Sequence, residues 1–154
     1  MKIPTTRFGE IKVEEKQIID IPGGLVGFPQ CERFVLLEHL KESPYRWLQS
    51  VDEPSVAFLV INPSSIVKDY AIRLNPEVAE SLYLSEETLK MVLAIVSVPL
   101  GKSKEATVNL VAPIVVNSEK RLGKQLILED TDWSIHHRIY GTSEEVRSVE
   151  EKAA

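Results

Sequence analysis

The residues best equipped for chemistry gather near the carboxyl end of the sequence, where two acids and two imidazoles lie close together: Asp130, Asp132, His136 and His137. Such a set could hold a metal ion or transfer a proton. However, adjacent histidines on a strand point to opposite faces, and neither H-x-H nor H-x-x-x-H spacing is present. The pattern favours a solvated surface, so we predict no metal ion, no cofactor and no catalytic residue.

A nucleophile can also be drawn in this region from Ser134 and His136 with an upstream aspartate. A triad is defined by its geometry, and the sequence lacks the G-x-S-x-G turn that presents a nucleophilic serine. A hydrolase is therefore the third of our alternatives. It requires that His136→Ala abolishes an activity while protein binding stays intact.

Two further motifs could bind nucleotides or nucleic acid. The glycine-rich segment 23–27 lacks the G-K-[ST] ending of a phosphate-binding loop and leads into no predicted helix. Arg46 and Trp47 could stack on a single strand, although the neighbouring Leu48 and Val51 favour burial of the indole. A small β-barrel that binds nucleic acid is the second alternative.

Charge and cysteine content narrow the class of partner. The chain of 154 residues carries 23 acidic against 18 basic residues, a formal net charge of -5. This balance disfavours a phosphate backbone and suits a basic protein partner. Cys31 is the sole cysteine, which excludes an intramolecular disulfide and fits a reducing compartment. With no secretory signal and no run long enough to cross a bilayer, we expect a cytoplasmic protein.

The elements that must position these residues are mostly strands, because short apolar runs alternate with turn residues. A helix is predicted after the cap residue Asn75, through Pro76 and Glu77 to Leu82, with a second helical turn ending near Lys90. We expect strands at residues 2–13 (a hairpin turning at Gly9), 18–21, 33–37, 46–51, 56–61, 70–74, 91–98, 107–111, 114–116 and 125–128.

This order of elements predicts a mainly β, single-domain, antiparallel β-barrel-like fold with one or two short helices. The domain is expected to cover residues 1–140. Residues 141–154 are rich in glutamate and weakly apolar, so we predict a polar C-terminal tail there, either a short helix or disordered.

Six blocks of this sequence resemble the bacterial flagellar assembly factor family FliW. They fall in order over roughly residues 1 to 138: Thr6–Ile11, Pro22–Phe28, Arg33–Leu37, Tyr45–Ser50, Leu110–Asn117 and Gly123–Gln125. Each block is short, but together they are specific. The tail after Gly141 carries no resemblance.

The resemblance implies a non-enzymatic cytoplasmic regulator with a barrel-like fold. Members of the family bind newly made flagellin and the translational repressor CsrA, a small dimeric RNA-binding protein. While flagellin occupies the factor, CsrA represses flagellin translation. After flagellin is exported, the released factor binds CsrA away from its RNA surface and lowers its affinity for RNA. The resemblance thus implies two protein partners, no direct contact with nucleic acid or membrane, and a monomer when free.

Residue-level contacts are predicted on physical grounds alone. The candidates are aromatic, charged and amide side chains near the first turn, around the block Tyr45–Ser50 and on the late strands. They are Phe8, Glu10, Arg46, Gln49, Asp52, Asn109 and Asn117. Glu53 and Asp69 are added as carboxylates that would face basic residues of CsrA. Because few interface residues carry most of the binding energy, we expect under half of them to matter.

Overall fold

The computed structural model describes residues 1–129 and 131–140. The tail predicted at 141–154 and the acid Asp130 lie outside the described residues. Within the described part, mainly β structure is confirmed, with few and short helices.

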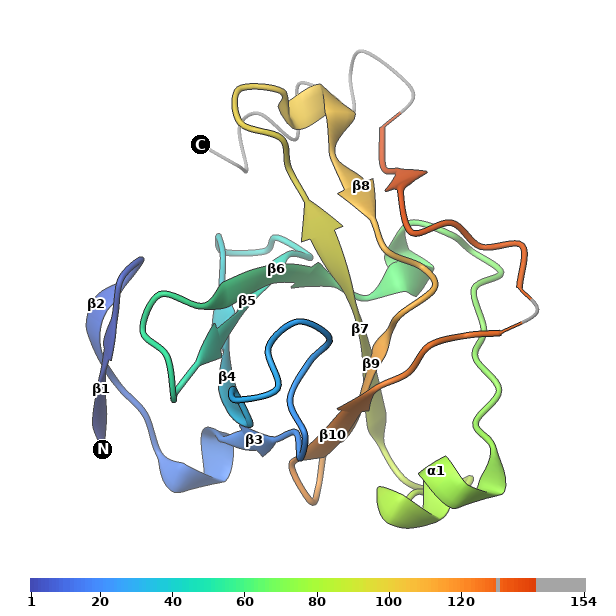
Figure 1. Cartoon of the computed structure of the whole chain (residues 1–154), viewed down its shortest axis with the longest axis horizontal. Helices are drawn as coiled ribbons and strands as arrows, with labels where there is room; N and C mark the ends of the chain where they lie inside the picture. The colour runs from blue at the N-terminus through green and yellow to red at the C-terminus, as the bar shows by residue number, and fades with distance from the viewer. Residues whose placement is uncertain (130, 141–154) are drawn as a thin grey trace.

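The core of the fold is a closed ring of seven strands (Figure 1). In ring order these are β3 (Ile19–Asp20), β4 (Arg33–Glu38), β5 (Arg46–Ser50), β6 (Ala57–Ile61), β7 (Lys90–Ser97), β9 (Ile114–Asn117) and β10 (Leu122–Gln125). All neighbours are antiparallel except β10 and β3, which close the ring in parallel where Leu122 lies opposite Asp20.

Strand β7 changes neighbours along its length. Its first half pairs with β9, Ala94 and Ile95 pair with β6, and its last residues pair with β8 (Thr107–Val108). A hairpin formed by the end of β7 and by β8 projects beyond the barrel, with the 3-10 helix η3 (Ser103–Glu105) near its tip (Figure 1). A third short strand, β11 (His137–Arg138), pairs with β8 along this projecting hairpin.

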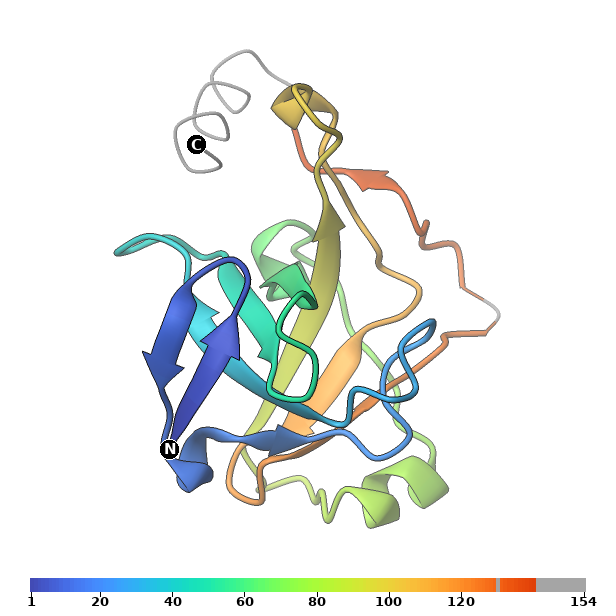
Figure 2. The ribbon, with the colours of Figure 1, turned by 60° about the vertical axis from the view of Figure 1, so that its left-hand side comes forward.

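A second, two-stranded sheet stands beside the barrel next to β4 and β5 (Figure 2). It consists of β1 (Lys2–Thr5) and β2 (Gly9–Lys12), and a 3-10 helix, η1 (Glu15–Gln17), connects it to β3. Ile3 and Val13 are buried against Val35 on β4, so this hairpin covers an outer face of the barrel. The hairpin predicted to turn at Gly9 is thereby confirmed.

Inside the ring, alternate strand residues form one apolar cluster. The loop between β3 and β4 contributes buried Leu25, and Phe28 packs edge-on against Phe58 with ring centres 5.1 Å apart. Gly24 in this loop has φ +69°, and a Cβ there would lie 2.2 Å from the carbonyl oxygen of Phe28. Only glycine satisfies both constraints.

The predicted helix is confirmed as α1 (Pro76–Ser81), capped where Asn75 Oδ1 accepts a hydrogen bond from the Val78 N–H at 2.8 Å. The second short turn is present but is not helical: Ser85 and Thr88 form a hydrogen-bonded turn. A third 3-10 helix, η2 (Pro63–Ser65), follows β6.

Three predicted strands differ from the structure. The strand expected at 107–111 ends at Val108, and Asn109 Oδ1 then accepts hydrogen bonds from the N–H groups of Val111 and Ala112 in a loop. Residues 70–74 form no strand; Ile72 and Leu74 pack as irregular chain around Leu82. The strand expected at 125–128 ends instead at Gln125, where the facing Pro113 has no N–H to continue the ladder. Among the helices of the described residues, none has the length and apolar character needed to cross a bilayer.

Candidate functional site

Trp47 on β5 is the centre of a cluster of side chains from three elements. Its indole N–H donates a hydrogen bond to His39 Nδ1 at 3.0 Å, just after β4. The Arg7 guanidinium lies 4.1 Å from the centre of the indole ring, and the Phe8 ring meets that ring edge-on at 6.0 Å. Arginine stacked on an indole is a stabilising cation–π contact.

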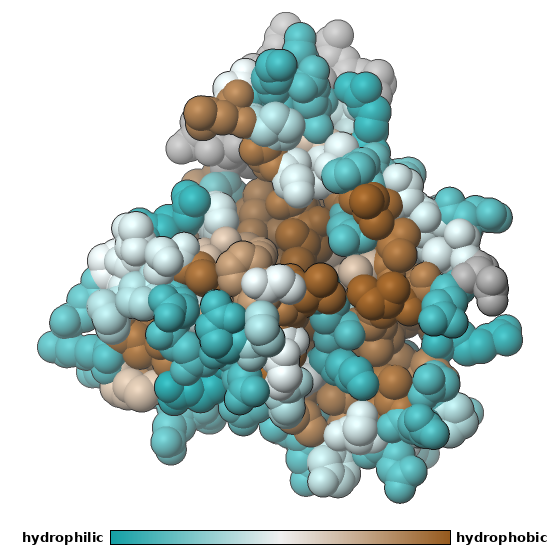
Figure 3. Space-filling model, in the orientation of Figure 1, coloured by the Kyte–Doolittle hydropathy of each residue, from teal (hydrophilic) through white to brown (hydrophobic). Residues whose placement is uncertain are grey.

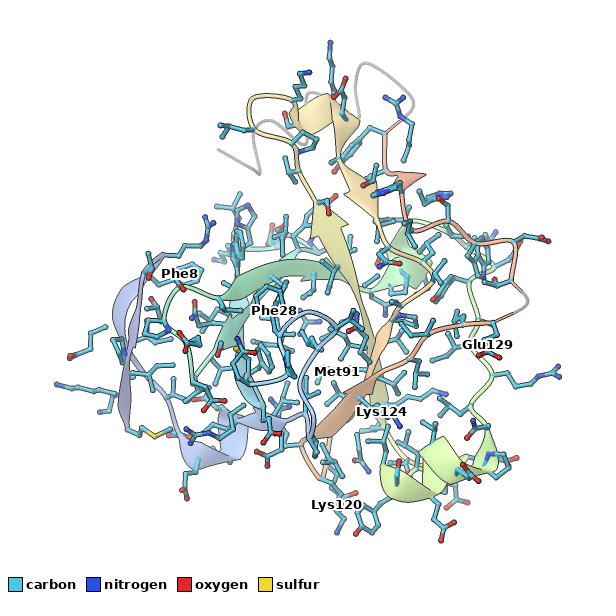
Figure 4. The ribbon with its side chains drawn as sticks, in the orientation of Figure 1. Phe8, Phe28, Met91, Lys120, Lys124 and Glu129 are labelled. Atoms are coloured by element: carbon cyan, nitrogen blue, oxygen red, sulfur yellow. The ribbon has the colours of Figure 1, made fainter. Side chains whose placement is uncertain are left out.

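The turn between β1 and β2 places Arg7 and Phe8 in this cluster. Thr5 Oγ1 accepts a hydrogen bond from the Phe8 N–H and donates one to the Gly9 carbonyl, and Gly9 has φ +68°. The Thr6 N–H also bonds to the carbonyl of Pro54 in the β5–β6 turn. The hairpin end is thus fixed against the barrel, and Figure 4 shows Phe8 at this end.

A groove of about 740 Å³ opens beside the Trp47 cluster. We call it the β6–β7 groove. Three residues of the Trp47 cluster line one part of it: Arg7, His39 and Trp47. The rest of its wall comes from β6, the end of β7 and the loop that follows β7: Ala57, Phe58, Leu59, Ile95, Val96, Ser97, Val98, Pro99, Leu100, Gly101, Lys102 and Ser103. In Figure 3, hydrophobic surface gathers in a hollow at the foot of the projecting hairpin.

The β6–β7 groove exists because two neighbouring strands separate. Register pairs join Val60 to Ile95 and Ile61 to Ala94, and no further pair joins β6 to β7 in the described part of the chain. Continuing the register would bring residues 57–59 opposite residues 96–98, yet both triplets line the groove. Here β6 is paired only with β5, and β7 only with β8.

The groove is positively charged, although the chain as a whole is acidic. Arg7 and Lys102 line it and no aspartate or glutamate does. His39 adds no full charge at neutral pH, because partial burial and the neighbouring Arg7 lower its pKa below the usual value. The site can therefore offer apolar surface, strand edges and two cations to a ligand.

Of the predicted contact residues, Phe8 lies in the Trp47 cluster. Arg46 precedes Trp47 on β5, so its side chain leaves the opposite face of the strand and does not line the groove. Glu10 is exposed on β2, with its carboxylate 3.7 Å from Lys2 Nζ. Glu53 and Asp69 are exposed in loops, one before β6 and one between η2 and α1. The structure does not bring all of these side chains to one face.

Gln49 and Asn117 have internal roles, which correct their placement on a surface. Gln49 is fully buried and its amide donates to the carbonyls of Ser50, Pro54 and Val56. Asn117 is 1% exposed; its amide donates to the carbonyls of Leu82 and Tyr83. A polar side chain inside a strand can serve buried backbone groups as well as a partner, and the sequence alone does not distinguish these roles.

Asp52 and Asn109 are also committed to the backbone. Asp52 accepts hydrogen bonds from the N–H groups of Glu32 and Arg33 and forms an ion pair with the Arg33 guanidinium at 2.9 Å. Partial burial alone would raise the pKa of Asp52, but these hydrogen bonds and the Arg33 charge outweigh it and lower the pKa. Asn109 accepts from the N–H groups of Val111 and Ala112 and shapes the loop after β8.

The suspected chemistry near the C-terminus has no support from the geometry. Ser134 Oγ accepts a hydrogen bond from the His136 N–H, and His137 pairs with Val108 as part of β11. Across residues 1–129 and 131–140 there is no group of three or more His, Cys, Asp or Glu side chains that could hold a metal ion.

Sequence reasoning missed Arg7, His39 and Lys102. The available signal was the apolar sequence Val98-Pro99-Leu100, which continues beyond the end of a strand onto a turn. Leu100 is fully exposed, and Val98 is 38% exposed. Apolar residues on a projecting turn are a hint of a binding surface.

Comparison with known proteins agrees with this architecture. The family model described as FliW protein matches residues 2–139. The flagellar assembly factor FliW of Natranaerobius thermophilus is 39% identical over 140 residues, covering 91% of this chain and 93% of that protein. Its counterpart in Desulfitobacterium hafniense is 44% identical over 140 residues, covering 91% of each chain.

A solved structure is similar over almost the whole fold. It is described as the crystal structure of the flagellar assembly factor FliW, and it matches with a TM-score of 0.83 and 38% identity over 92% of this chain and 98% of that one. The family match and these identities extend over the barrel, the outer hairpin and the projecting hairpin together. This chain belongs to the FliW family of flagellar assembly factors.

Proposed function

We propose that this chain binds flagellin and CsrA in turn, and that its binding to CsrA relieves the repression of flagellin translation. The observation that carries the proposal is the family match over residues 2–139, which includes every strand of the barrel. In this proposal the chain acts in the cytoplasm as a monomer, with residues 1–140 as one domain. It transforms no substrate and needs no cofactor.

Relief of repression requires CsrA to have two states that differ in affinity for this chain. If binding occurs away from the RNA surface, the chain must prefer the state with low RNA affinity. Flagellin then acts as a competitor that controls how much free chain is available. The two partners lower each other's apparent affinity for the chain, whether or not their surfaces overlap.

The distribution of charge supports a basic partner on faces other than the groove. Glu10, Glu53 and Asp69 are exposed, and the chain has a net charge of -5. Opposite fields accelerate encounter between proteins. Phe8, in the Trp47 cluster, and Arg46, on the opposite face of β5, remain proposed contacts; the internal roles of Gln49, Asp52, Asn109 and Asn117 make them supports of the surface in this proposal.

The test is a titration of the full chain against flagellin, CsrA and the flagellin leader RNA at two salt concentrations. We expect micromolar or tighter binding to both proteins, competition between them, and weak binding to RNA. Tight RNA binding that falls steeply with salt would favour the nucleic-acid-binding alternative. No binding to either protein at micromolar levels would contradict the proposal.

The role of the acidic loops has a separate test. Glu53→Gln combined with Asp69→Asn should slow association with CsrA about threefold and change dissociation less, because rim charges act mainly on encounter. The matched control is Glu86→Gln with Glu87→Gln, which removes the same charge from another exposed loop. Equal association rates for the two double variants would remove Glu53 and Asp69 from the surface.

A further inference from the structure

We propose that the β6–β7 groove binds an extended segment of another polypeptide, which pairs its backbone with the open edge of β7 and directs carboxylates toward Arg7 and Lys102. This inference goes beyond the proposed function, because it names a mode of recognition and a ligand chemistry. It does not depend on which partner supplies the segment.

The backbone of β7 provides the first part of the site. Val96 and Ser97 are paired with Val108 and Thr107 on the side of β8. On their other side the register with β6 has ended, and Ser97 and Val98 are exposed. An unpaired strand edge is a template for an added strand, and proteins that do not use such an edge usually block it with proline, charge or a covering element. Residues 95–98 carry neither proline nor charge.

The walls of the groove provide the second part. Phe58, Leu59 and Ile95 are only partly buried, and the rim residue Val98 is 38% exposed. Side chains of a strand alternate between its two faces. A segment paired with β7 would therefore place every second side chain on this apolar floor, and the remaining side chains would face solvent.

Charge selects among segments that could pair in this way. The Arg7 guanidinium is held over Trp47, and Lys102 lies in the loop between β7 and η3. In the part of the chain that the structure describes, neither cation forms a salt bridge. Two unneutralised cations at an apolar groove favour an occupant with apolar residues at alternate positions and an acidic end.

Nucleic acid fits this groove less well. Two cations neutralise few phosphates, while the whole chain is acidic. Trp47, the indole in the lining, already has Arg7 stacked on its ring. It therefore offers a poorer platform for a base than a free aromatic face would.

The experiment uses the full chain and a synthetic probe, an acetylated and amidated peptide of two aspartates followed by three valine–threonine repeats. Amide hydrogen exchange is followed by NMR with and without the probe. We expect exchange to slow at least threefold at Val96 and Val98, whose N–H groups face the open edge; Ser97 faces Thr107 on β8 and should change little. The same peptide with proline in place of its second valine should give no protection, because proline interrupts pairing. Absence of protection by the first peptide at millimolar concentration overturns the proposal.

Charge reversal supplies the matched variants. Lys102→Glu should weaken the acidic probe about threefold at low salt and strengthen a probe with lysines in place of aspartates. Lys104→Glu is the control, since Lys104 is exposed on η3 and does not line the groove. Equal effects of the two variants overturn the charge assignment. Protection of the Val96 and Val98 N–H groups in the chain alone, at any protein concentration, would mean that the groove is already occupied by the chain or by a second copy, and would also overturn the proposal.

Discussion

Two seams of the same barrel are built in opposite ways. Between β4 and β5, five register pairs run from Phe34–Ser50 to Glu38–Arg46, and Asp52 closes the seam by binding the backbone at Glu32 and Arg33. Between β6 and β7, only two register pairs form before the strands separate into the groove. We call the first the closed seam and the second the open seam.

The contrast shows which polar residues are available to a partner. At the closed seam Asp52 is acidic and partly exposed, yet its carboxylate oxygens are used within the chain. At the open seam the residues are mostly apolar, yet among the described residues the strand edges are unpaired and neither Arg7 nor Lys102 forms a salt bridge. Residue type is therefore a weaker guide to a binding surface than unused bonding capacity.

The largest effect is expected in the loop that leads into the closed seam. Gly24→Ala places a Cβ 2.2 Å from the Phe28 carbonyl oxygen at φ +69°, which should cost about 3 kcal/mol or more of unfolding free energy. Gly23→Ala is the matched control, because φ is +83° there but the Cβ meets nothing within 4 Å. It should cost about 1 kcal/mol. Urea unfolding measures both, and equal losses would mean that the loop shifts to accommodate the methyl group.

The second-largest loss of stability is expected when the Asp52 carboxylate is removed from the closed seam. Asp52→Ala leaves the Glu32 and Arg33 N–H groups and the Arg33 guanidinium without their acceptor, and should cost about 2 kcal/mol. Glu53→Ala, one residue later and exposed, should change stability by less than about 0.5 kcal/mol. If the two variants unfold at the same urea concentration, the closed seam does not depend on Asp52.

Sequence reasoning succeeded where one local signal decides the structure. Asn75 followed by Pro76 specifies the start of α1, and Gly9 specifies the turn of the outer hairpin. It could not place the open seam, because β7 is apolar almost throughout and carries no mark of where its neighbour changes. The change appears only in the tertiary pairing: β7 passes from β9 to β8 after Leu93, and its register with β6 ends at the pair Val60–Ile95.

The candidate site was only partly predictable for the same reason. Phe8, Arg46 and Trp47 stand out by type and adjacency. Lys102 is remote from them in sequence, and only the course of the projecting hairpin brings it to the groove beside Trp47. Gln49 and Asn117 attracted notice as polar residues within strands, but the structure shows that buried carbonyl groups explain them.

A pH series sharpens the comparison at the closed seam. The pKa of Asp52 is lowered on folding. Its carboxylate therefore contributes fully to the free energy of unfolding above the ordinary carboxyl pKa, about 4, and this contribution is lost as the pH falls below that value. Wild type should therefore lose stability between pH 5 and pH 3 more steeply than Asp52→Asn. Glu53→Gln should follow the wild-type slope. Parallel curves for wild type and Asp52→Asn would contradict the assignment of this carboxylate.

The smallest effect belongs to the open seam. Trp47→Phe keeps an aromatic ring under Arg7 but removes the N–H that donates to His39, which should cost about 1 kcal/mol. Burial and the neighbouring Arg7 lower the pKa of His39 on folding, so the unfolded chain takes up the proton at a higher pH than the folded chain does. The contribution of neutral His39 to the free energy of unfolding is therefore fully present above about pH 6.5 and is lost as the pH falls below that value. Protonated Nδ1 cannot accept the indole N–H, so the cost of Trp47→Phe should shrink between pH 7.5 and pH 5.5. A cost independent of pH would show that the indole N–H contributes nothing through His39.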